Sequence, residues 1–412
     1  MNLENHFLKS KKSINYESLV KQIDKSIKFH NWDCILPELP LEAVLVGGYI
    51  RDLILGKTCN NPDIDIIVPS NSLEIAKEIS IKHNTKFIVL DKAREIVRVI
   101  FKDFIIDISP QLGNSLTEDL TSRDLTINSI AYSFSSRSII DPSHGLKDLY
   151  SSFLRTNDTE NLVHDPLRML RCFRFYAEMD FEIDPEIIDF ISLHKNKLSE
   201  VSAERIQNEL KKIVCGEFAN RANYLINKIE LFDWIQSYEN LTNNNIQYLK
   251  DSSFQLLKSN PSITFFYLTE ILSNSTLKKF KFSKSEISNV RNLRKWKNKL
   301  IHKSISQFSE RERFDLHKEL EKILPALIVY LPRELQNKWL RRWRNNADNL
   351  FHPKNVVDGN TLKSFINIEE GPLLGDLLDY LSREFAYDRL NGFDDAIYKA
   401  KQWFKQNAPK CD

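Results

Sequence analysis

Strand-forming patterns are confined to roughly the first 150 residues of this 412-residue chain, and this division constrains its fold most strongly. Short apolar runs, AVLV, DIDIIV, KFIVL and VRVIF among them, alternate there with helical stretches. From Asp158 onward, segments such as DPLRMLRCFRFYAEM carry apolar residues at helical spacing instead. The sequence therefore predicts an α+β protein, with a mixed-sheet head followed only by helices.

The length predicts two or three domains. We expect the head over residues 25–150, a helical neck over 151–215, and a helical body and tail over 216–412. Apolar residues at helical spacing predict a leading helix over about 14–38, a short helix over 49–56 and another helix over 123–134.

Composition and cysteine usage indicate an intracellular protein. The net charge is only +2, although basic clusters such as RNLRKWKNK and LRRWRNN lie in the C-terminal half. Five cysteines are scattered singly with no C-x-x-C pair, which favours reduced thiols over disulfides or a zinc site. No apolar run approaches the ~20 residues needed to span a bilayer, and the N-terminus lacks a signal-peptide pattern. A cytoplasmic location without membrane contact is predicted.

Two aspartates one residue apart interrupt an otherwise apolar strand. Asp63 and Asp65 would share one face of that strand, because successive side chains alternate. Like charges so close raise each other's pKa unless a cation neutralises them. Hard oxygen ligands without nearby His or Cys favour Mg²⁺. The alternative is a solvated edge strand with alternating polar residues.

A glycine pair precedes this strand. Gly47 and Gly48 follow a short buried strand and are predicted to form a tight turn before a helix. Paired glycines allow close approach of a ligand to the backbone, and a helix N-terminus favours phosphate. Arg51, predicted in the first turn of that helix, would need an anion, either Asp52 or a phosphate.

Together, GGYIRD and DIDIIV resemble motif A of the nucleotidyltransferase superfamily, in particular the class II CCA-adding enzyme and bacterial poly(A) polymerase family. Four further segments follow in that family's order: SRDLTINSIAY (122–132), DPSHGLKDLYSSFLRT (141–156), HDPLRMLRCFRF (164–175) and VSAERIQNELKKI (201–213). Two positions depart from the family pattern, with Ser122 and His164 in place of Arg and Glu. Five motifs in sequence are a far more specific signal than any one of them.

The resemblance implies a head domain that transfers a nucleotide from CTP or ATP to the 3′ end of tRNA. Asp63 and Asp65 would hold Mg²⁺. Phosphate, ribose and triphosphate contacts would come from Gly47, Gly48, Arg51, Arg123, Asp124 and Asn128. On the predicted 123–134 helix, Asp124 and Asn128 would share one face.

Base selection would fall to Asp165 and Arg168, with Arg171 steadying the pair or the triphosphate. A carboxylate accepts from an exocyclic amine, and a guanidinium donates to a ring nitrogen or carbonyl, so C and A fit while U and G fail one contact. The alternative is an ordinary amphipathic helix whose arginines are paired with acidic neighbours.

The stretch between motif A and SRDLTIN is short, and it runs directly from a strand into an acidic turn. Family members that add all of C, C and A usually carry a flexible loop there, and its absence is typical of members that add only the two C residues. The resemblance thus favours CC addition, with a companion A-adding enzyme possible. Asp107, at a strand end in this stretch, is a candidate third catalytic carboxylate or simply a polar strand terminus.

Several alternatives stay open at this point. Full CCA addition and poly(A) synthesis are close alternatives, whereas a catalytically silent RNA-binding protein and a small-molecule nucleotidyltransferase are more distant ones. The basic stretches near Trp296 and Trp343 are predicted to position RNA through phosphate contacts, or are solvated helices with the Trp packed inward. The candidate RNA-binding residues are Arg294, Lys295, Arg341, Arg342 and Arg344.

Overall fold

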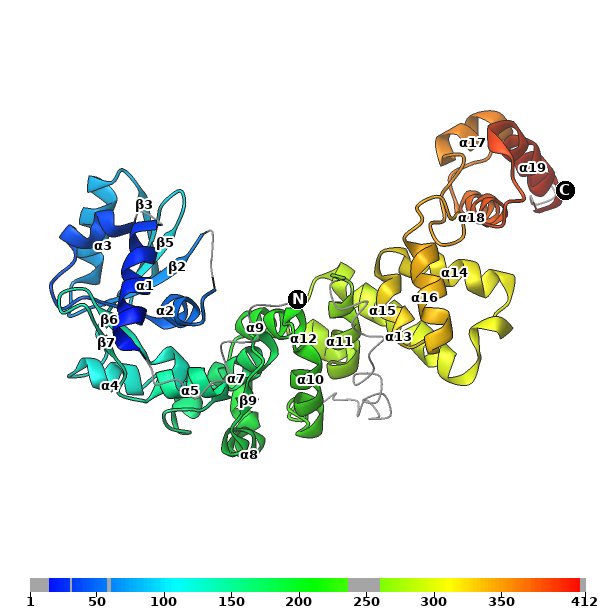
Figure 1. The fold of residues 1–412 in the computed structure, drawn as a ribbon. Helices are drawn as coiled ribbons and strands as arrows, with labels where there is room; N and C mark the ends of the chain where they lie inside the picture. The colour runs from blue at the N-terminus through cyan, green and yellow to red at the C-terminus, as the bar shows by residue number, and fades with distance from the viewer. Residues whose placement is uncertain (1–14, 30–31, 58–60, 236–259, 408–412) are drawn as a thin grey trace. The chain divides into compact units, whose positions relative to one another are not determined.

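The computed structural model describes residues 15–29, 32–57, 61–235 and 260–407. They divide into two compact units, unit 1 up to Phe218 and unit 2 from Ala219 onward. Unit 1 combines a sheet with helices, whereas unit 2 is helical (Figure 1). The predicted α+β class is therefore confirmed. None of the helices in the described ranges is long and apolar enough to cross a membrane.

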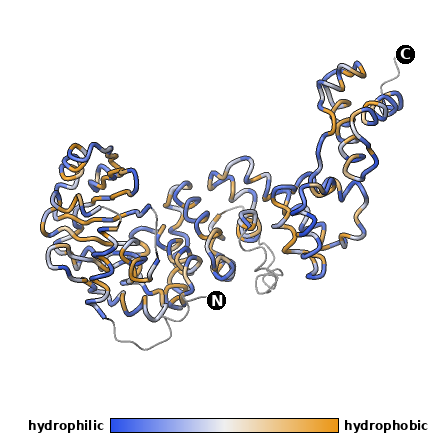
Figure 2. The backbone as a smooth tube through the Cα atoms, turned by 45° about the horizontal axis from the view of Figure 1, so that its top comes forward, coloured by the Kyte–Doolittle hydropathy of each residue, from blue (hydrophilic) through white to orange (hydrophobic). Residues whose placement is uncertain are grey.

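A seven-stranded mixed sheet forms the centre of unit 1. Its strands are β1 (Val44–Val46), β2 (Asp63–Val68), β3 (Lys86–Asp91), β4 (Ile96–Ile100), β5 (Ile105–Pro110), β6 (Ala131–Ser133) and β7 (Ser138–Ile140). Their order is β3-β4-β5-β2-β1-β6-β7, with β2 and β5 parallel and every other pair antiparallel. Much of the hydrophobic colour of unit 1 runs through these strands in Figure 2.

Helices and two short strands complete unit 1. The helices are α1 (Tyr16–Phe29), α2 (Gly47–Ile54), α3 (Ser72–Lys82), α4 (Leu116–Thr121), α5 (Gly145–Ser151), α6 (Asn161–His164), α7 (Leu167–Glu178), α8 (Pro185–His194) and α9 (Ala203–Cys215). The 3₁₀ segments are η2 (Trp32–Glu38), η3 (Thr126–Asn128) and η4 (Lys195–Glu200). The strands β8 (Phe153–Leu154) and β9 (Glu182–Ile183) pair in parallel.

The strand register places the carboxylates on one face of the sheet. Asp65 is paired with Asp107 on β5 and with Val46 on β1, so the three side chains point the same way. Val46 belongs to a small buried cluster with Leu120 of α4. Helix α4 therefore covers part of the face that carries the carboxylates.

Unit 2 contains α10 (Ala219–Lys228), α11 (Ile263–Ile271), α12 (Asn274–Lys279), α13 (Lys284–His302), α14 (Glu310–Leu320), α15 (Leu324–Ile328), α16 (Arg333–Trp343), α17 (Gly359–Ile366), α18 (Pro372–Ala386) and α19 (Gly392–Asn407). Short 3₁₀ segments are η7 (Ile305–Gln307) and η8 (Glu321–Ile323). Helices α17–α19 share an apolar cluster that includes Leu362, Leu377 and Ala400.

Four local expectations were wrong. The leading helix is interrupted: α1 ends at Phe29 and a 3₁₀ segment begins at Trp32, while residues 14 and 30–31 of the expected helix lie outside the described part. The short helix begins at Gly47 rather than 49, because Gly47 adopts φ +80 and turns the chain directly from β1 into α2. The acidic turn is the helix α4, capped by the Ser115 side chain, which accepts from the Glu118 N–H. Strand structure also recurs beyond 158, at β9.

The predicted 123–134 helix is the largest discrepancy. Only η3 is helical there, and β6 follows it. Tertiary hydrogen bonds replace the helical ones, since the Thr126 N–H donates to the Arg155 carbonyl and Leu125 bridges Thr156. Strand β6 then pairs with β1 and extends the sheet. Pairing with a distant strand thus overrides the local helical pattern.

Candidate active site

Strand β2 presents Asp63 and Asp65 as the sequence predicted, on one face and beside the glycine turn. A Cβ added to Gly47 would lie 2.5 Å from Asp65 Oδ2. The Asp65 carboxylate therefore occupies the space that a side chain at position 47 would need. Gly47 meets two demands at once, because its positive φ also disfavours any other residue.

The electrostatics of this corner favour a bound cation. Burial, reinforced by Asp107 and Asp63 and opposed by Arg123, raises the pKa of Asp65 to about 6. Burial and then Asp107 also raise the pKa of Asp63, against the lowering influence of Arg98. Carboxylates that resist ionisation in the free protein gain most from a divalent cation.

The residues present fit a hard metal ion. Asp63 and Asp65 offer carboxylate oxygens, the ligand type that Mg²⁺ prefers, and neither has a His or Cys beside it. Within the described ranges, no group of three or more His, Cys, Asp or Glu side chains is arranged as a metal site. The metal prediction therefore rests on the pair Asp63 and Asp65, with substrate phosphates expected to complete the coordination.

Asp107 lies beside the pair, inside β5 rather than at the strand end that the sequence predicted, and its carboxylate is already paired. Arg98 of β4 donates from Nε to Asp107 Oδ1 (2.8 Å) and from Nη2 to Asp107 Oδ2 (2.7 Å). The same Nη2 lies 3.6 Å from Asp63 Oδ1. The catalytic role predicted for Asp107 stays a prediction, and its carboxylate is held by an arginine that sequence analysis did not single out.

Arg51 lies in the last turn of α2, not in its first turn, because the helix begins at Gly47. Its guanidinium donates to Asp52 Oδ1 (3.0 and 2.9 Å) and to Asn128 Oδ1 (2.8 Å). The expected anionic partner is therefore Asp52 in this state. Val46, the N-cap residue of α2, provides no side-chain hydrogen bond to the first turn of the helix.

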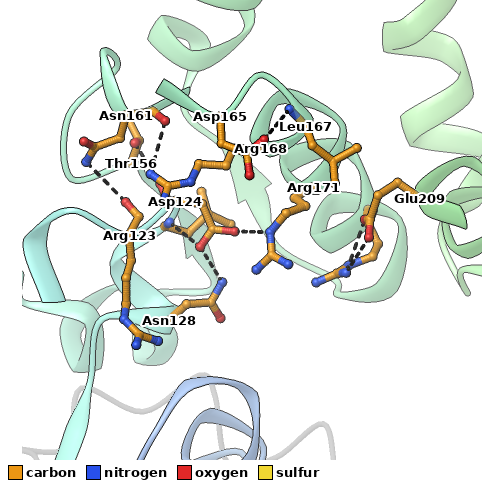
Figure 3. Close-up of polar contacts among 12 residues, drawn as sticks. Arg123, Asp124, Asn128, Thr156, Asn161, Asp165, Leu167, Arg168, Arg171 and Glu209 are labelled. Carbon is orange, nitrogen blue, oxygen red and sulfur yellow. Dashed lines mark hydrogen bonds and ion pairs between the residues drawn. The ribbon is translucent and has the colours of Figure 1, made fainter. Parts of the chain in front are cut away.

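Asp124 and Asn128 are in contact, although no α-helix brings them together. The Asn128 amide donates to Asp124 Oδ1 (3.0 Å), and both side chains are buried. Burial alone would raise the pKa of Asp124, but Arg171 and Asn128 hold it well below its usual range. Arg171 Nε donates to Asp124 Oδ2 at 2.5 Å (Figure 3). Arg123 lies close by, 3.4 Å from Asp119.

The proposed base-selecting pair stands at the start of α7 (Figure 3). Asp165 precedes the helix rather than lying in it, and its carboxylate accepts from Arg205 Nη2 (2.8 Å). Arg168 Nη1 donates to the carbonyl oxygens of Ser122 (2.6 Å) and Asn161 (3.2 Å). Arg168 is thus held by the Ser122 and Asn161 carbonyls, and Asp165 is held from α9.

Family models match two parts of the chain. A model described as the poly(A) polymerase head domain matches residues 43–155, and one described as a probable RNA- and SrmB-binding site of polymerase A matches residues 180–238. A CC-adding tRNA nucleotidyltransferase of Synechocystis is 28% identical over 404 residues, covering 88% of this chain and 94% of that protein. These matches support a class II CCA-adding enzyme family for this chain.

The proteins to which this chain is similar carry two names. A CC-adding tRNA nucleotidyltransferase of Geobacter sulfurreducens is 34% identical over 174 residues, which is 42% of this chain and 40% of that protein. A CCA-adding enzyme of Ligilactobacillus salivarius is 26% identical over 397 residues, covering 90% of this chain and 94% of that one.

Solved structures share the fold of this protein. A CCA-adding enzyme in complex with ATP aligns with a TM-score of 0.70 at 19% identity, covering 93% of this chain and 98% of that one. A Thermotoga maritima CCA-adding enzyme complexed with tRNA aligns with a TM-score of 0.65 at 20% identity, covering 88% and 91%. At these identities the likeness shows the fold alone.

The basic residues proposed to contact RNA differ in their surroundings. Arg294 donates to Asn274 Oδ1 and to the carbonyls of Thr269 and Leu272, so it ties α13 to the end of α11. Lys295 pairs with Glu319 (2.7 Å). These contacts favour a structural role for both residues.

Arg342, on α16, forms a two-bond pair with Asp348 (2.7 and 3.0 Å). Arg341 and Arg344 are exposed, and neither side chain forms an ion pair within the described part of unit 2. They are the better candidates for phosphate contacts. Trp296 is buried, as the solvated-helix alternative expected.

Sequence analysis missed two charged side chains of this region, Arg98 and Glu209. Arg98 is a lone cation in the strand IVRVI, on the same face as the carboxylates, and that pattern was a usable signal. Glu209 is buried and pairs with Arg174 (3.1 Å), joining α9 to α7. Only packing of the two helices reveals that pair.

Proposed function

We propose that this protein transfers CMP from CTP to the 3′-hydroxyl of a tRNA that lacks its CCA end, releasing pyrophosphate and stopping after two C residues. The proposal rests on one observation. Asp63 and Asp65 lie together beside Gly47, and the raised pKa of Asp65 favours a bound cation there. The names and wide coverage of the CC-adding relative support it.

Asp63 and Asp65 would hold Mg²⁺, which when bound would neutralise the triphosphate and favour ionisation of the attacking hydroxyl. The uncapped N-terminus of α2 and Arg123 would orient the triphosphate, since both offer donors beside Asp65. Arg51 and Asn128 would hold the ribose and phosphates once their mutual hydrogen bond is exchanged.

Asp165 and Arg168 would read the incoming base. The hydrogen bonds from Arg205 to Asp165, and from Arg168 to two backbone carbonyls, fix the direction in which each group faces. A pair fixed in advance can discriminate between bases, because it does not rearrange to suit U or G. Arg171 would keep the pair in register through its ion pair with Asp124.

The short connection between β5 and α4 supports CC addition. Strand β5 ends at Pro110 and α4 begins at Leu116, so only residues 111–115 join them. This is the place where CCA-adding members of the family usually carry a flexible loop. A companion A-adding enzyme would then complete the tRNA end.

Full CCA addition is the second candidate, supported by the CCA-adding relatives that cover 94% and 93% of their own lengths. The test offers the purified protein Mg²⁺, labelled CTP or ATP, and transcripts of one tRNA with no CCA end, with CC, and with the complete end. CC addition predicts incorporation of CMP into the first transcript only and no AMP into the second. Incorporation of AMP after CC would establish CCA addition, and long A tails on any transcript would establish poly(A) synthesis.

A further inference from the structure

Arg98 is the one feature of the acidic corner that neither the proposed reaction nor the predicted site explains. It lies on β4, opposite Asp107 of β5 in the antiparallel register. The remaining residues of β4 are aliphatic, so the strand carries a single cation, directed to the face that holds the carboxylates.

The contact between Arg98 and Asp107 has the geometry of a strong pair. Both carboxylate oxygens accept from the guanidinium, at 2.8 and 2.7 Å, in the two-bond arrangement that arginine favours. The Asp107 side chain is largely buried, whereas Arg98 is about one-third exposed. Both carboxylate oxygens of Asp107 therefore already accept hydrogen bonds from Arg98.

The guanidinium also extends to the proposed metal ligands. Nη2 lies 3.6 Å from Asp63 Oδ1 in addition to its bond with Asp107. The guanidinium of Arg98 therefore already partly neutralises the negative charge that would attract a metal ion.

We propose that Arg98 is a positioning residue that competes with the metal ion for the carboxylates, holding Asp107 out of the ligand set and weakening metal binding at Asp63. This inference rests on the proposed role of Asp63 and Asp65. Two cations cannot both take full advantage of the same carboxylates, so neutralising Arg98 strengthens metal binding rather than weakening it. A merely structural arginine would not produce that sign.

The test measures Mn²⁺ binding to the full-length protein without nucleotide, from the loss of the free-ion electron paramagnetic resonance signal. Arg98→Gln should lower the dissociation constant for Mn²⁺ by about tenfold. Arg98→Lys keeps the charge and should stay close to the parent. Arg94→Gln is the matched control, because Arg94 lies on the turn before β4, its side chain is 74% exposed, and Asp91, at 3.9 Å, is its one ion-pair partner among the residues that the structure describes.

A double variant tests whether Asp107 accounts for the tighter Mn²⁺ binding. If Asp107 becomes a ligand when Arg98 is neutral, Arg98→Gln with Asp107→Asn should lose most of the improvement. Unchanged or weaker Mn²⁺ binding by Arg98→Gln, in protein whose thermal unfolding is still cooperative, would overturn the inference. Where the Gln variant does not fold, Arg98→Met gives the same comparison.

Failure of this inference is distinguishable from failure of the proposed function. Asp63→Asn and Asp65→Asn should each abolish Mn²⁺ binding and CMP incorporation. If they do so while Arg98→Gln has no effect on Mn²⁺, only the role of Arg98 is wrong. If they leave both readouts intact, the metal site itself is wrong.

Discussion

Asp65 couples the stability of the protein to the cation site. Its pKa is raised from 3.8 to about 6, so between those pH values the metal-free folded protein holds a proton that the unfolded chain has released. Folding stability therefore falls as pH rises through this window, and the loss reaches about 3 kcal/mol above pH 6.

Asp65→Asn removes this titration. We expect the metal-free variant to be more stable than the parent at pH 8, by up to about 3 kcal/mol, and similar to it near pH 4. Denaturant unfolding in a chelating buffer measures the difference. Mg²⁺ should then stabilise the parent but not the variant, and a variant less stable than the parent at pH 8 would contradict the assignment.

The stability of the protein also depends on the ion pair between Arg171 and Asp124. Asp124 is buried, and its low pKa is maintained by Arg171 and Asn128. Arg171→Gln leaves that carboxylate without its cation, so we expect a loss of about 2–3 kcal/mol in unfolding free energy, discounted because Arg171 is one-third exposed. Urea unfolding checks this, and Arg205→Gln, at a more exposed pair, should cost less.

At the scale of an element, the junction between β1 and α2 requires a glycine both for its backbone conformation and for the position of Asp65. Gly47→Ala meets both a positive φ and a Cβ only 2.5 Å from Asp65 Oδ2, whereas Gly56→Ala meets a positive φ with open space around it. We expect both to lose about 1 kcal/mol of stability from backbone strain. Only Gly47→Ala should also reduce CMP incorporation, by about a hundredfold, because it displaces Asp65.

Equal activity of the two alanine variants would show that the Gly47 contact does not matter. Thermal unfolding of each variant separates lost stability from lost activity. The comparison is matched, since both substitutions add one methyl group at a left-handed glycine of the α2 region.

At the scale of the whole molecule, the basic residues of unit 2 separate into packed and exposed groups. Arg341→Gln with Arg344→Gln should weaken tRNA binding and reduce its salt dependence by about two ions, because counterion release scales with phosphate contacts. Arg294→Gln should instead lower the stability of unit 2, because it breaks bonds between α11, α12 and α13. Filter binding across a salt series, beside a melting curve, distinguishes the two effects.

Removal of the metal tests whether CMP incorporation, but not tRNA binding, depends on the ion. Excess chelator should abolish incorporation of CMP, and added Mg²⁺ should restore it without refolding, because Asp63 and Asp65 are already positioned by β2. Binding of tRNA in the same buffer should persist, since phosphate contacts from arginine do not need the ion. Loss of tRNA binding on chelation would contradict this division of roles.

The sequence alone was sufficient to predict the α+β class, the family and the shared face of Asp63 and Asp65, because these depend on local periodicity and on motifs of fixed spacing. It was misleading for 123–134, where apolar spacing is helical but pairing of β6 with β1 decides the structure. Only the tertiary structure brought Arg98 to Asp107, Arg205 to Asp165 and Arg171 to Asp124, since each pair joins elements distant in the chain. Side chains that meet across strands and helices depend on packing, which no local pattern encodes.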